Sequence, residues 1–410
     1  MKKMSLSQKI LFGLISGLVV GLALYQVREV AFVKNILLDF GFNLVGNIFI
    51  RGIRMIVIPL VFFSLMLGVA SIEDVSKLGR LGVKTLGFYM ATTIISVGIA
   101  LFIGNIMNPG IGVAADAVQK VTVTVNSSKS FIDVLLGMVP VNPIEAMAKG
   151  DMLAIITFAI ISGVALSLLK EKGNNVRNLV IELNNLSLKL VEIVMLLAPY
   201  GVFCLIAKMF ATLGYTAVLP IVKYVVAVII ALFILVVTVY PIILITVAKY
   251  SPIKFIKKFF PVMVLAFSTS SSAACLPTSM KTVEEEFNVS NTIASFALPL
   301  GNTINMNGTS IMQGIATIFI AQVYGVELTM ANYVSIIITA TLASIGTAGV
   351  PGVGVIMLGM VLTEVGLPIE GIALVMGIDR VVDMFRTVVN VTGDAVCTVA
   401  LARSEGEDLK

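Results

Sequence analysis

The chain contains no histidine and no tryptophan, and charged residues make up only 12% of its 410 positions. The absence of histidine removes the usual general base, the usual proton shuttle and the most familiar metal ligand. The three cysteines, Cys204, Cys275 and Cys397, are scattered through apolar segments and predict neither a disulfide framework nor a zinc site. Soluble domains carry about 25% charged residues, so the scarcity of charge argues against a soluble fold.

Apolar residues dominate instead, at 58% of the chain, with a mean hydropathy of +1.05. This composition predicts an integral membrane protein that crosses the bilayer several times and contacts its lipid. The net charge of +5 is spread over loops, for example at Lys170, Lys172 and Lys254. We interpret this charge as a topology signal rather than as a nucleic-acid-binding surface.

The N-terminal segment places Lys2, Lys3 and Lys9 before an apolar run over residues 10–25. Signal peptides begin in the same way, but no small-residue cleavage site of the usual kind follows, and further apolar spans come after it. We therefore expect a retained first helix whose N-terminus lies in the cytoplasm.

The first half of the chain predicts six membrane spans, near residues 7–27, 37–70, 81–107, 130–169, 185–212 and 219–249. The second and the fourth are longer than the about 20 residues that one upright helix needs, so we expect them to be tilted or broken. The polar segment 110–129 lacks periodicity and predicts an exposed loop.

The second half contains two long stretches without charge, 287–326 and 328–363, that are interrupted by Gly, Pro, Ser, Thr and Asn. Two interruptions resemble each other, because 268–277 and 343–352 are both runs of small residues with a Pro near the end and apolar sequence on either side. Broken helices in corresponding positions of two halves are typical of the binding site of secondary transporters. Backbone leaves the helix at membrane depth only where it lines a cavity or is buried in protein.

Five ionisable residues gather near the C-terminus: Asp379, Arg380, Asp383, Arg386 and Asp394. A charge at the bilayer centre costs about 2.5 to 3.5 kcal/mol on insertion scales, so such groups persist where they face a cavity, a partner or a ligand. On one helix, most of them share with Asn390 an arc of roughly 80° that extends for about 22 Å. A salt-bridge ladder that only packs helices is the alternative, but it does not explain the nearby carboxamides, hydroxyls and helix breaks.

The run Asn-Met-Asn-Gly-Thr at 305–309 predicts a cation site. Gly308 is the expected unwinding point, and the freed carbonyls and the polar side chains around it supply hard oxygen ligands. The alternative is a glycine kink whose polar neighbours bond to their own backbone. The polar residues 301–303, one turn earlier, favour the ion site.

Two further runs have both a functional and a structural interpretation. The Ser-rich run 268–272 offers hydroxyls and helix N-terminal amides for a carboxylate, or a close-packing surface for neighbouring helices. The glycines of 348–354 suggest a phosphate loop, but the following Lys-Ser/Thr and the preceding strand are missing, so a hairpin tip or gate is favoured.

Enzyme interpretations are weak. An intramembrane aspartyl protease needs two carboxyls that share a proton, whereas Asp379 and Asp394 would lie about 22 Å apart on one helix. A serine hydrolase built on Ser271 or Ser272 lacks a histidine and any obvious base. We therefore expect a transporter rather than an enzyme, with a channel as a remaining alternative.

The sequence resembles the glutamate transporter family, the dicarboxylate/amino acid:cation symporters, over about residues 7–405. The likeness is strongest in four motifs, at 270–277 (Ser-Ser-Ser-Ala-Ala-Cys-Leu-Pro), 305–309 (Asn-Met-Asn-Gly-Thr), 343–352 (Ala-Ser-Ile-Gly-Thr-Ala-Gly-Val-Pro-Gly) and 383–394 (Asp-Met-Phe-Arg-Thr-Val-Val-Asn-Val-Thr-Gly-Asp). The resemblance implies an all-α polytopic membrane protein with eight transmembrane helices, two re-entrant helical hairpins and inverted repeats. It also implies a homotrimer in a prokaryotic plasma (inner) membrane.

In that family a transport domain moves like an elevator against a trimeric scaffold. The resemblance implies that 1–80 forms scaffold helices 1 and 2, that 81–107 is the third helix, in the transport domain, and that 108–212 forms scaffold helices 4 and 5. The remaining transport domain would be 219–410, with helix 6, a hairpin at 252–285, helix 7 at 288–322, a hairpin at 328–362 and helix 8 at 366–404.

For the substrate, the matching motif positions imply that Asp383 holds an amino group and Arg386 a side-chain carboxylate, which Lys could not copy in bidentate form. The other positions implied to contact the substrate are Ser271, Ser272, Thr309, Val350, Thr387 and Asn390. Neutral amino acid carriers of the family lack the arginine, and C4-dicarboxylate carriers are expected to lack the aspartate. Aspartate or glutamate is therefore the expected substrate, with a neutral or sulfur amino acid as the alternative.

The resemblance also implies about two coupling sodium ions and no other cofactor. One site matches Gly301, Asn305, Asn390 and Asp394, and a second matches Thr303, Ser344, Ile345 and Thr347. A third site in sodium-coupled members matches Tyr89, Thr92, Thr93, Asn305 and position 307. Those members carry Asp at position 307, where this chain has Asn307, so the third site has lost an anionic ligand.

The coupling ion is left open between sodium and protons. The pair Asp379-Arg380 also occurs in bacterial members, some of them proton-coupled. Proton carriers of the family typically have an acidic residue in the first hairpin tip, and 270–275 has none. The sequence therefore favours sodium, with proton coupling or uncoupled exchange as alternatives.

Overall fold

The computed structural model describes residues 6–70, 79–112, 136, 139–214, 218–345, 347 and 352–410. All regular elements in these residues are helical, which confirms the all-α fold class. Five of the described helices are long and apolar enough to cross a membrane, and shorter apolar helices accompany them. The chain is therefore an integral membrane protein.

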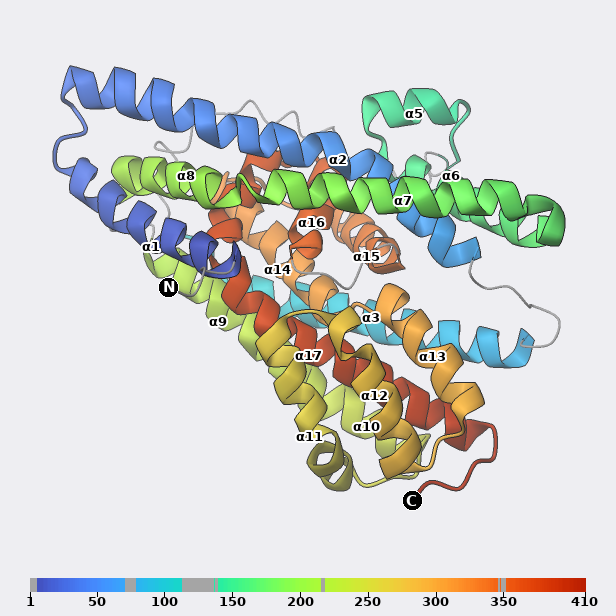
Figure 1. The fold of residues 1–410 in the computed structure, drawn as a ribbon. Coiled ribbons are helices and arrows are strands. Elements are labelled where there is room, and N and C mark those ends of the chain that lie inside the picture. The colour runs from blue at the N-terminus through green and yellow to red at the C-terminus, as the bar shows by residue number, and fades with distance from the viewer. Residues whose placement is uncertain are drawn as a thin grey trace, which may run out of the picture.

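The first part of the chain forms α1 (Leu6–Tyr25), the π-helix η1 (Phe32–Phe42), α2 (Asn43–Ala70), α3 (Gly79–Met107), α5 (Pro143–Lys149), α6 (Met152–Leu169), the 3₁₀ turn η3 (Lys170–Gly173), α7 (Asn174–Met195) and α8 (Ala198–Leu213). In Figure 1, α2, α7 and α8 run along one side of the molecule, with α1 beside α8. α3 instead packs among the later helices, against α14 and α15.

The second part forms α9 (Val218–Ile234), the π-helix η5 (Leu235–Val239), α10 (Tyr240–Thr246), α11 (Pro252–Thr269), α12 (Ser272–Phe287), α13 (Asn291–Ile304), α14 (Asn307–Val323), α15 (Met330–Ile345), α16 (Val353–Glu364), the 3₁₀ turn η6 (Ile369–Gly371) and α17 (Ile372–Ser404). α14 lies at the centre of this group and contacts α3, α9, α15, α16 and α17. α17 is the long red helix of Figure 1.

Small residues let α1 and α8 approach closely. Gly17 and Gly21 are one helical turn apart, and a Cβ at these positions would lie 2.8 Å from the carbonyl oxygen of Phe203 and 2.7 Å from that of Ala207. Membrane helices associate through such backbone contacts, because lipid tails are as apolar as the side chains they replace. This pair anchors the first helix group.

Serine residues cap the helix ends in the hairpin made by α11 and α12. Ser251 caps the start of α11, where Pro252 occupies the first helical position. At the tip, Ser270 adopts the left-handed conformation (φ 50°) and ends α11, and the Ser271 hydroxyl accepts a hydrogen bond from the Ala274 N–H at 3.3 Å. The chain thus reverses within two serines, and the cap pairs one of the free N–H groups at the start of α12.

Several boundaries differ from the predicted ones. The described part of the span expected at 130–169 is divided into α5 and α6, because Gly150 takes a left-handed φ of 76° after α5. The helix expected to begin at 185 begins at Asn174 and bends between α7 and α8. The helix expected at 366 begins at Ile372, after Pro368 and a short 3₁₀ turn. Residues 113–129 of the expected loop lie outside the described residues.

The expected unwinding point at Gly308 is wrong. The break between α13 and α14 lies at Asn305 and Met306, and Gly308 is in the first turn of α14. Gly308 serves close approach instead, because a Cβ there would lie 3.0 Å from Cγ of Arg386 and still closer to that residue's carbonyl oxygen. The break nevertheless interrupts an otherwise apolar, buried segment.

Candidate functional site

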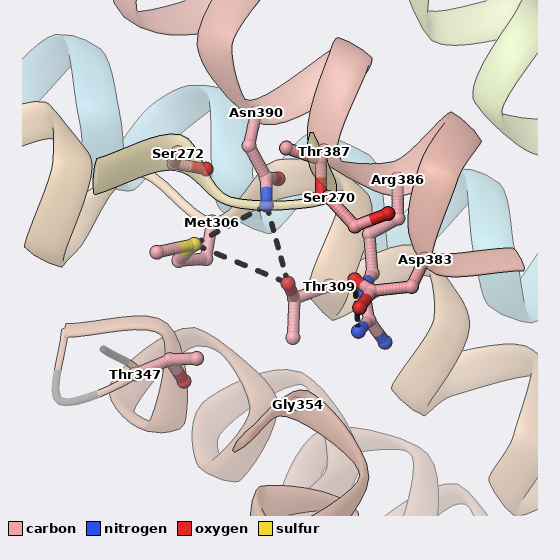
Figure 2. Close-up of a pocket in the computed structure, with 10 residues that line it drawn as sticks. All are labelled: Ser270, Ser272, Met306, Thr309, Thr347, Gly354, Asp383, Arg386, Thr387 and Asn390. Atoms are coloured by element: carbon pink, nitrogen blue, oxygen red, sulfur yellow. Dashed lines mark hydrogen bonds and ion pairs between the residues drawn. The ribbon is translucent and has the colours of Figure 1, made fainter. Parts of the chain in front are cut away.

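One face of α17 meets both helix hairpins and the α13–α14 break in a small polar cavity (Figure 2). Its lining residues are Ser270, Ser272, Met306, Thr309, Thr347, Gly354, Asp383, Arg386, Thr387 and Asn390. The four α17 residues are spaced 3, 1 and 3 positions apart, as one helical face requires. The cavity measures about 10 Å³, enough for about one water molecule.

Most of the residues predicted to bind substrate are brought together here, namely Ser272, Thr309, Asp383, Arg386, Thr387 and Asn390. Ser271 is not among the lining residues, because its hydroxyl caps α12. Val350 lies outside the described residues. The sequence interpretation missed Ser270, Met306 and Gly354 as lining residues and assigned Thr347 to a cation site only.

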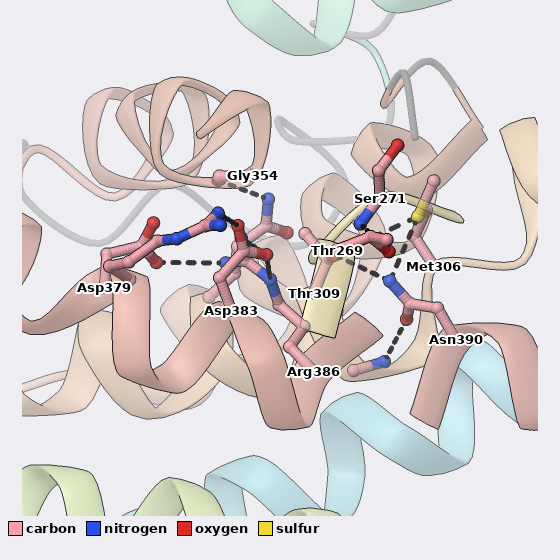
Figure 3. Close-up of polar contacts among 12 residues, drawn as sticks. Thr269, Ser271, Met306, Thr309, Gly354, Asp379, Asp383, Arg386 and Asn390 are labelled. Atoms are coloured by element: carbon pink, nitrogen blue, oxygen red, sulfur yellow. Dashed lines mark hydrogen bonds and ion pairs between the residues drawn. The ribbon is translucent and has the colours of Figure 1, made fainter. Parts of the chain in front are cut away.

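Arg386 is held by two carboxylates (Figure 3). Its Nη2 lies 2.5 Å and its Nε 3.1 Å from Oδ1 of Asp383, and its Nη1 lies 3.2 Å from Oδ1 of Asp379. Arg386 is 2% exposed and Asp383 4% exposed. A buried charge without a partner would cost several kcal/mol, so this arrangement lets the charges persist inside the membrane protein.

Asp379 and Arg380 were the two members of the charge cluster without a predicted role, and the structure places Asp379 against Arg386. Asp379 precedes Arg386 by seven residues, which is two helical turns on one face, so the spacing contained the signal. Arg380 is more loosely placed, with Nη1 3.8 Å from Oδ2 of Asp383. Together the two aspartates and two arginines balance each other in charge.

Gly354 makes room for Arg386. A Cβ on Gly354 would lie 2.9 Å from Nη1 of Arg386 and 3.0 Å from Cγ2 of Thr309. A side chain at this first turn of α16 would therefore displace the guanidinium. No local pattern in the sequence marks this contact, because it joins segments far apart in the chain.

Asn390 satisfies the backbone at the α13–α14 break. Its Oδ1 accepts a hydrogen bond from the N–H of Gly308 at 2.7 Å, and its Nδ2 donates to Oγ1 of Thr309 at 3.3 Å and to the sulfur of Met306 at 3.2 Å. Helix ends leave unpaired N–H groups that need such partners at membrane depth. Asn390 thereby connects the cavity to the polar cluster behind it.

Three residues of the first predicted cation group, Gly301, Asn305 and Asp394, lie together, whereas the fourth, Asn390, bonds to Gly308 and Thr309. The Nδ2 of Asn305 donates to Oδ1 of Asp394 at 2.9 Å, and Thr92 donates to Oδ1 of Asn305 at 3.2 Å. A Cβ on Gly301 would lie 2.7 Å from Oδ1 of Asp394, so the backbone there approaches the carboxylate closely. Carboxylate, carbonyl and amide oxygens are the ligands of hard cations.

The third predicted group is also brought together. Thr93 donates to Oδ1 of Asn307 at 2.9 Å, and Nδ2 of Asn307 donates to the hydroxyl of Tyr240 at 3.2 Å. Tyr240 in turn donates to the carbonyl oxygen of Val389 at 3.0 Å. Tyr89 donates to the carbonyl oxygen of Ala297 at 2.8 Å. Tyr240 was missed, since nothing in its local sequence connects it to this cluster.

The second predicted group is brought together only in part. Ser344 donates to the carbonyl oxygen of Ile304, the residue next to Thr303, at 2.9 Å. The hydroxyl of Thr303 is bonded within its own helix, to the carbonyl oxygen of Leu300 at 2.9 Å. Thr347 lines the polar cavity, and Ile345 ends α15. Among the described residues, no group of three or more His, Cys, Asp or Glu side chains is arranged to hold a metal ion.

Comparison with known proteins gives a consistent result over nearly the whole chain. The model of the sodium:dicarboxylate symporter family matches residues 6–404. The chain is 36% identical to the proton/sodium-glutamate symport protein of Geobacillus stearothermophilus, over 99% of this chain and 96% of that protein. It is 34% identical to the proton/glutamate-aspartate symporter of Escherichia coli (98% and 93% covered) and 33% identical to a C4-dicarboxylate transport protein of Bacillus subtilis (88% and 87% covered).

Proposed function

Because the chain belongs to the sodium:dicarboxylate symporter family, we propose that it is a cation-coupled symporter that takes up aspartate or glutamate. The observation that supports this most directly is the Asp383–Arg386 ion pair in the polar cavity. It presents a carboxylate and a guanidinium side by side, which complement an amino acid with an acidic side chain.

Substrate binding replaces one ion pair by two. The substrate ammonium takes the place of Arg386 at Asp383, and the substrate side-chain carboxylate takes the place of Asp383 at Nε and Nη2 of Arg386. Asp379 keeps its contact with Nη1 throughout. Arg386 has five N–H donors, so a bidentate carboxylate and the Asp379 contact fit together. The cavity is smaller than an amino acid, so its walls must separate and Arg386 must move for binding.

This exchange also selects the substrate class. A neutral amino acid would take Asp383 and leave Arg386 with Asp379 alone, and a C4-dicarboxylate would take Arg386 and leave Asp383 without its close partner. Removing one partner of a buried ion pair costs about 3–5 kcal/mol. Only a substrate with both an ammonium and a second carboxylate satisfies both residues. Its α-carboxylate would lie at Asn390 and the first hairpin tip, near Ser272.

For the coupling ion, we place sodium at Asp394, with Asn305 and the Gly301 backbone as further ligands, and a second ion near Ser344 and Thr303. Asn305, a proposed ion ligand, lies in the break between α13 and α14, and Asn390, which lines the cavity, accepts a hydrogen bond from the N–H of Gly308 just after that break. An ion that fixes the conformation of this break therefore also fixes Asn390, which would bind the substrate α-carboxylate. Proton coupling is the second candidate, because the names of the similar proteins include protons as well as sodium.

The proposed oligomeric state and the proposed division into scaffold and transport domains are those that the family resemblance implies. We propose a homotrimer in a prokaryotic plasma membrane with a cytoplasmic N-terminus, in which α3 and α9–α17 move together against α1, α2 and α5–α8. The packing of α3 among the later helices supports this division. No chemical transformation of the substrate is part of the proposal.

Sodium is expected to tighten aspartate affinity about 5- to 150-fold, the usual range of a coupling between sites, and aspartate must tighten sodium affinity by the same factor. The measurement is calorimetric or fluorescence titration of the purified protein in sodium and in choline medium. Uptake into proteoliposomes under an imposed sodium or proton gradient distinguishes the two ions. If aspartate affinity is equal in sodium and choline and a proton gradient drives uptake, the coupling ion is the proton rather than sodium.

Asn307→Asp is expected to increase the number of sodium ions transported per substrate. The new carboxylate stands between the hydroxyls of Thr93 and Tyr240, and Tyr240 can turn its hydrogen from the carbonyl oxygen of Val389 to the carboxylate. The ratio is obtained from reversal potentials in proteoliposomes. Asn105→Asp, on α3 away from the cluster, is the control. An unchanged ratio would contradict the role of position 307 in a third site.

A further inference from the structure

An apolar groove lies between α9, η5, α11 and α17, on the side of α17 away from the polar cavity. Figure 1 shows α17 packed against α9 and α11. Its volume is about 400 Å³, within the range of ligand-binding pockets. All of its lining side chains are apolar, among them Phe233, Val236, Phe260, Val264, Phe267 and Phe385. None of the residues that the structure describes fills this space.

The groove is open to the surroundings of the protein. Phe233 is 65% exposed, Phe260 57% and Val264 50%. α9 belongs to an apolar helix long enough to span the membrane, and so does the α17 segment. Side chains that line a void lose dispersion contacts, and the molecules available at this depth to restore them are lipid acyl chains.

A positive charge continues the groove at one end. Lys257 precedes Phe260 by three residues and Val264 by seven, so the three side chains share one face of α11. Along the axis of α11, Phe260 lies about 4.5 Å from Lys257, and Phe267 lies about 10 Å beyond Phe260. The apolar part of the groove on α11 extends from Phe260 to Phe267. This order, a charge followed by an apolar trough, matches the order of head group and acyl chain in a phospholipid.

The lysines at this end differ in their partners. Lys258 donates to the carbonyl oxygens of Glu286 and Lys410. Lys254 and Lys257 are exposed, and neither has an ion-pair partner among the residues that the structure describes. These two ammonium groups are therefore available to an anion outside the protein.

We propose that the groove binds one acyl chain of an anionic phospholipid, with its phosphate at Lys254 and Lys257. Basic residues next to a membrane attract anionic head groups, and the apolar trough adds specificity for a chain in a defined position. The site is separate from the substrate cavity and does not depend on the transported molecule.

The bound chain would brace two elements of the substrate cavity. The ring of Phe267 packs edge-to-face on that of Phe385, with centroids 5.1 Å apart and an interplanar angle of 82°. Phe267 lies three residues before the hairpin-tip Ser270, and Phe385 directly precedes Arg386. Lipid in the groove therefore holds the first hairpin against α17 and is expected to raise the thermal stability of the protein.

The test is native mass spectrometry of the full chain in neutral detergent, with phosphatidylglycerol and phosphatidylcholine of identical acyl chains as probes. The wild-type protein is expected to retain phosphatidylglycerol preferentially. Lys257→Ala is expected to lower that preference about fivefold, the effect of about one lysine near an anionic surface. Val264→Trp fills the groove and is expected to remove bound lipid of both kinds.

Two variants serve as matched controls. Lys281→Ala removes an exposed lysine from the other helix of the hairpin, and Ile242→Trp adds an indole to an exposed site on α10. Both are expected to retain phosphatidylglycerol as the wild type does. Thermal melting with each lipid added gives a second readout, and the shift caused by phosphatidylglycerol should disappear in Val264→Trp.

Three results would overturn the proposal. The first is equal retention of the two lipids by the wild type, and the second is undiminished phosphatidylglycerol in Val264→Trp. The third is an equal loss in Lys281→Ala and Lys257→Ala, which would indicate general surface attraction. A change of oligomeric mass in Val264→Trp without a change in bound lipid would place a second copy of the chain in the groove, and would also refute the lipid assignment.

Discussion

Arg386→Ala is expected to lower the affinity for aspartate and glutamate by about 100-fold or more. The substitution removes the only cationic side chain that lines the described cavity, and loss of one partner of a buried ion pair costs about 3–5 kcal/mol. Arg386→Lys keeps the charge but not the bidentate geometry, so it should fall between wild type and alanine. Equilibrium binding of labelled aspartate to the purified variants measures the effect.

Arg380→Ala is the matched control for this experiment. Arg380 is the neighbouring arginine on the same helix, its guanidinium lies 3.8 Å from Asp383, and it does not line the cavity. It should change aspartate affinity only slightly. Arg386→Ala should also admit neutral substrates such as serine or cysteine, which separates loss of specificity from loss of folding. Retained aspartate affinity in Arg386→Ala would refute the assigned role.

The sequence predicted which residues line the cavity better than it predicted which of them contact each other. Asp383, Arg386, Thr387 and Asn390 follow from helical spacing, because one turn of α17 determines which side chains share a face. The partner of Arg386 does not follow from the family motif. The structure gives that place to Asp383 itself, so the two residues expected to bind opposite ends of a substrate form an ion pair with each other.

The errors arise where tertiary contacts override local pattern. Gly308 has the intrinsic freedom to unwind, but Asn390 fixes its N–H and the approach of Arg386 requires the missing Cβ, so the helix breaks two residues earlier. Tyr240 contacts Val389, 149 positions away, and Gly354 faces Arg386, which lies in another helix. Such contacts leave no periodicity within one helix, and a single sequence contains no trace of them.

Asp394→Asn is expected to remove most of the sodium dependence of substrate binding. The substitution keeps the size of the side chain and one oxygen that can accept the hydrogen bond from Nδ2 of Asn305, which lies 2.9 Å from Oδ1 of Asp394. The fold should therefore survive, while the one carboxylate of the candidate ion site is lost. The ratio of aspartate affinities with and without sodium, expected to be about 5 to 150 in the wild type, should fall close to one.

Asp379→Asn separates the ion site from the substrate site. It also removes a buried carboxylate from α17, but that carboxylate contacts Arg386 at 3.2 Å rather than Asn305. The ratio of aspartate affinities with and without sodium should stay at the wild-type value in this variant. The aspartate affinity itself is expected to change, because Arg386 has lost one of the two carboxylates that contact it. If Asp394→Asn keeps the full sodium ratio, the coupling ion does not bind at Asp394. If Asp379→Asn loses that ratio while Asp394→Asn keeps it, the ion and the substrate are linked at the Asp379–Arg386 end of α17.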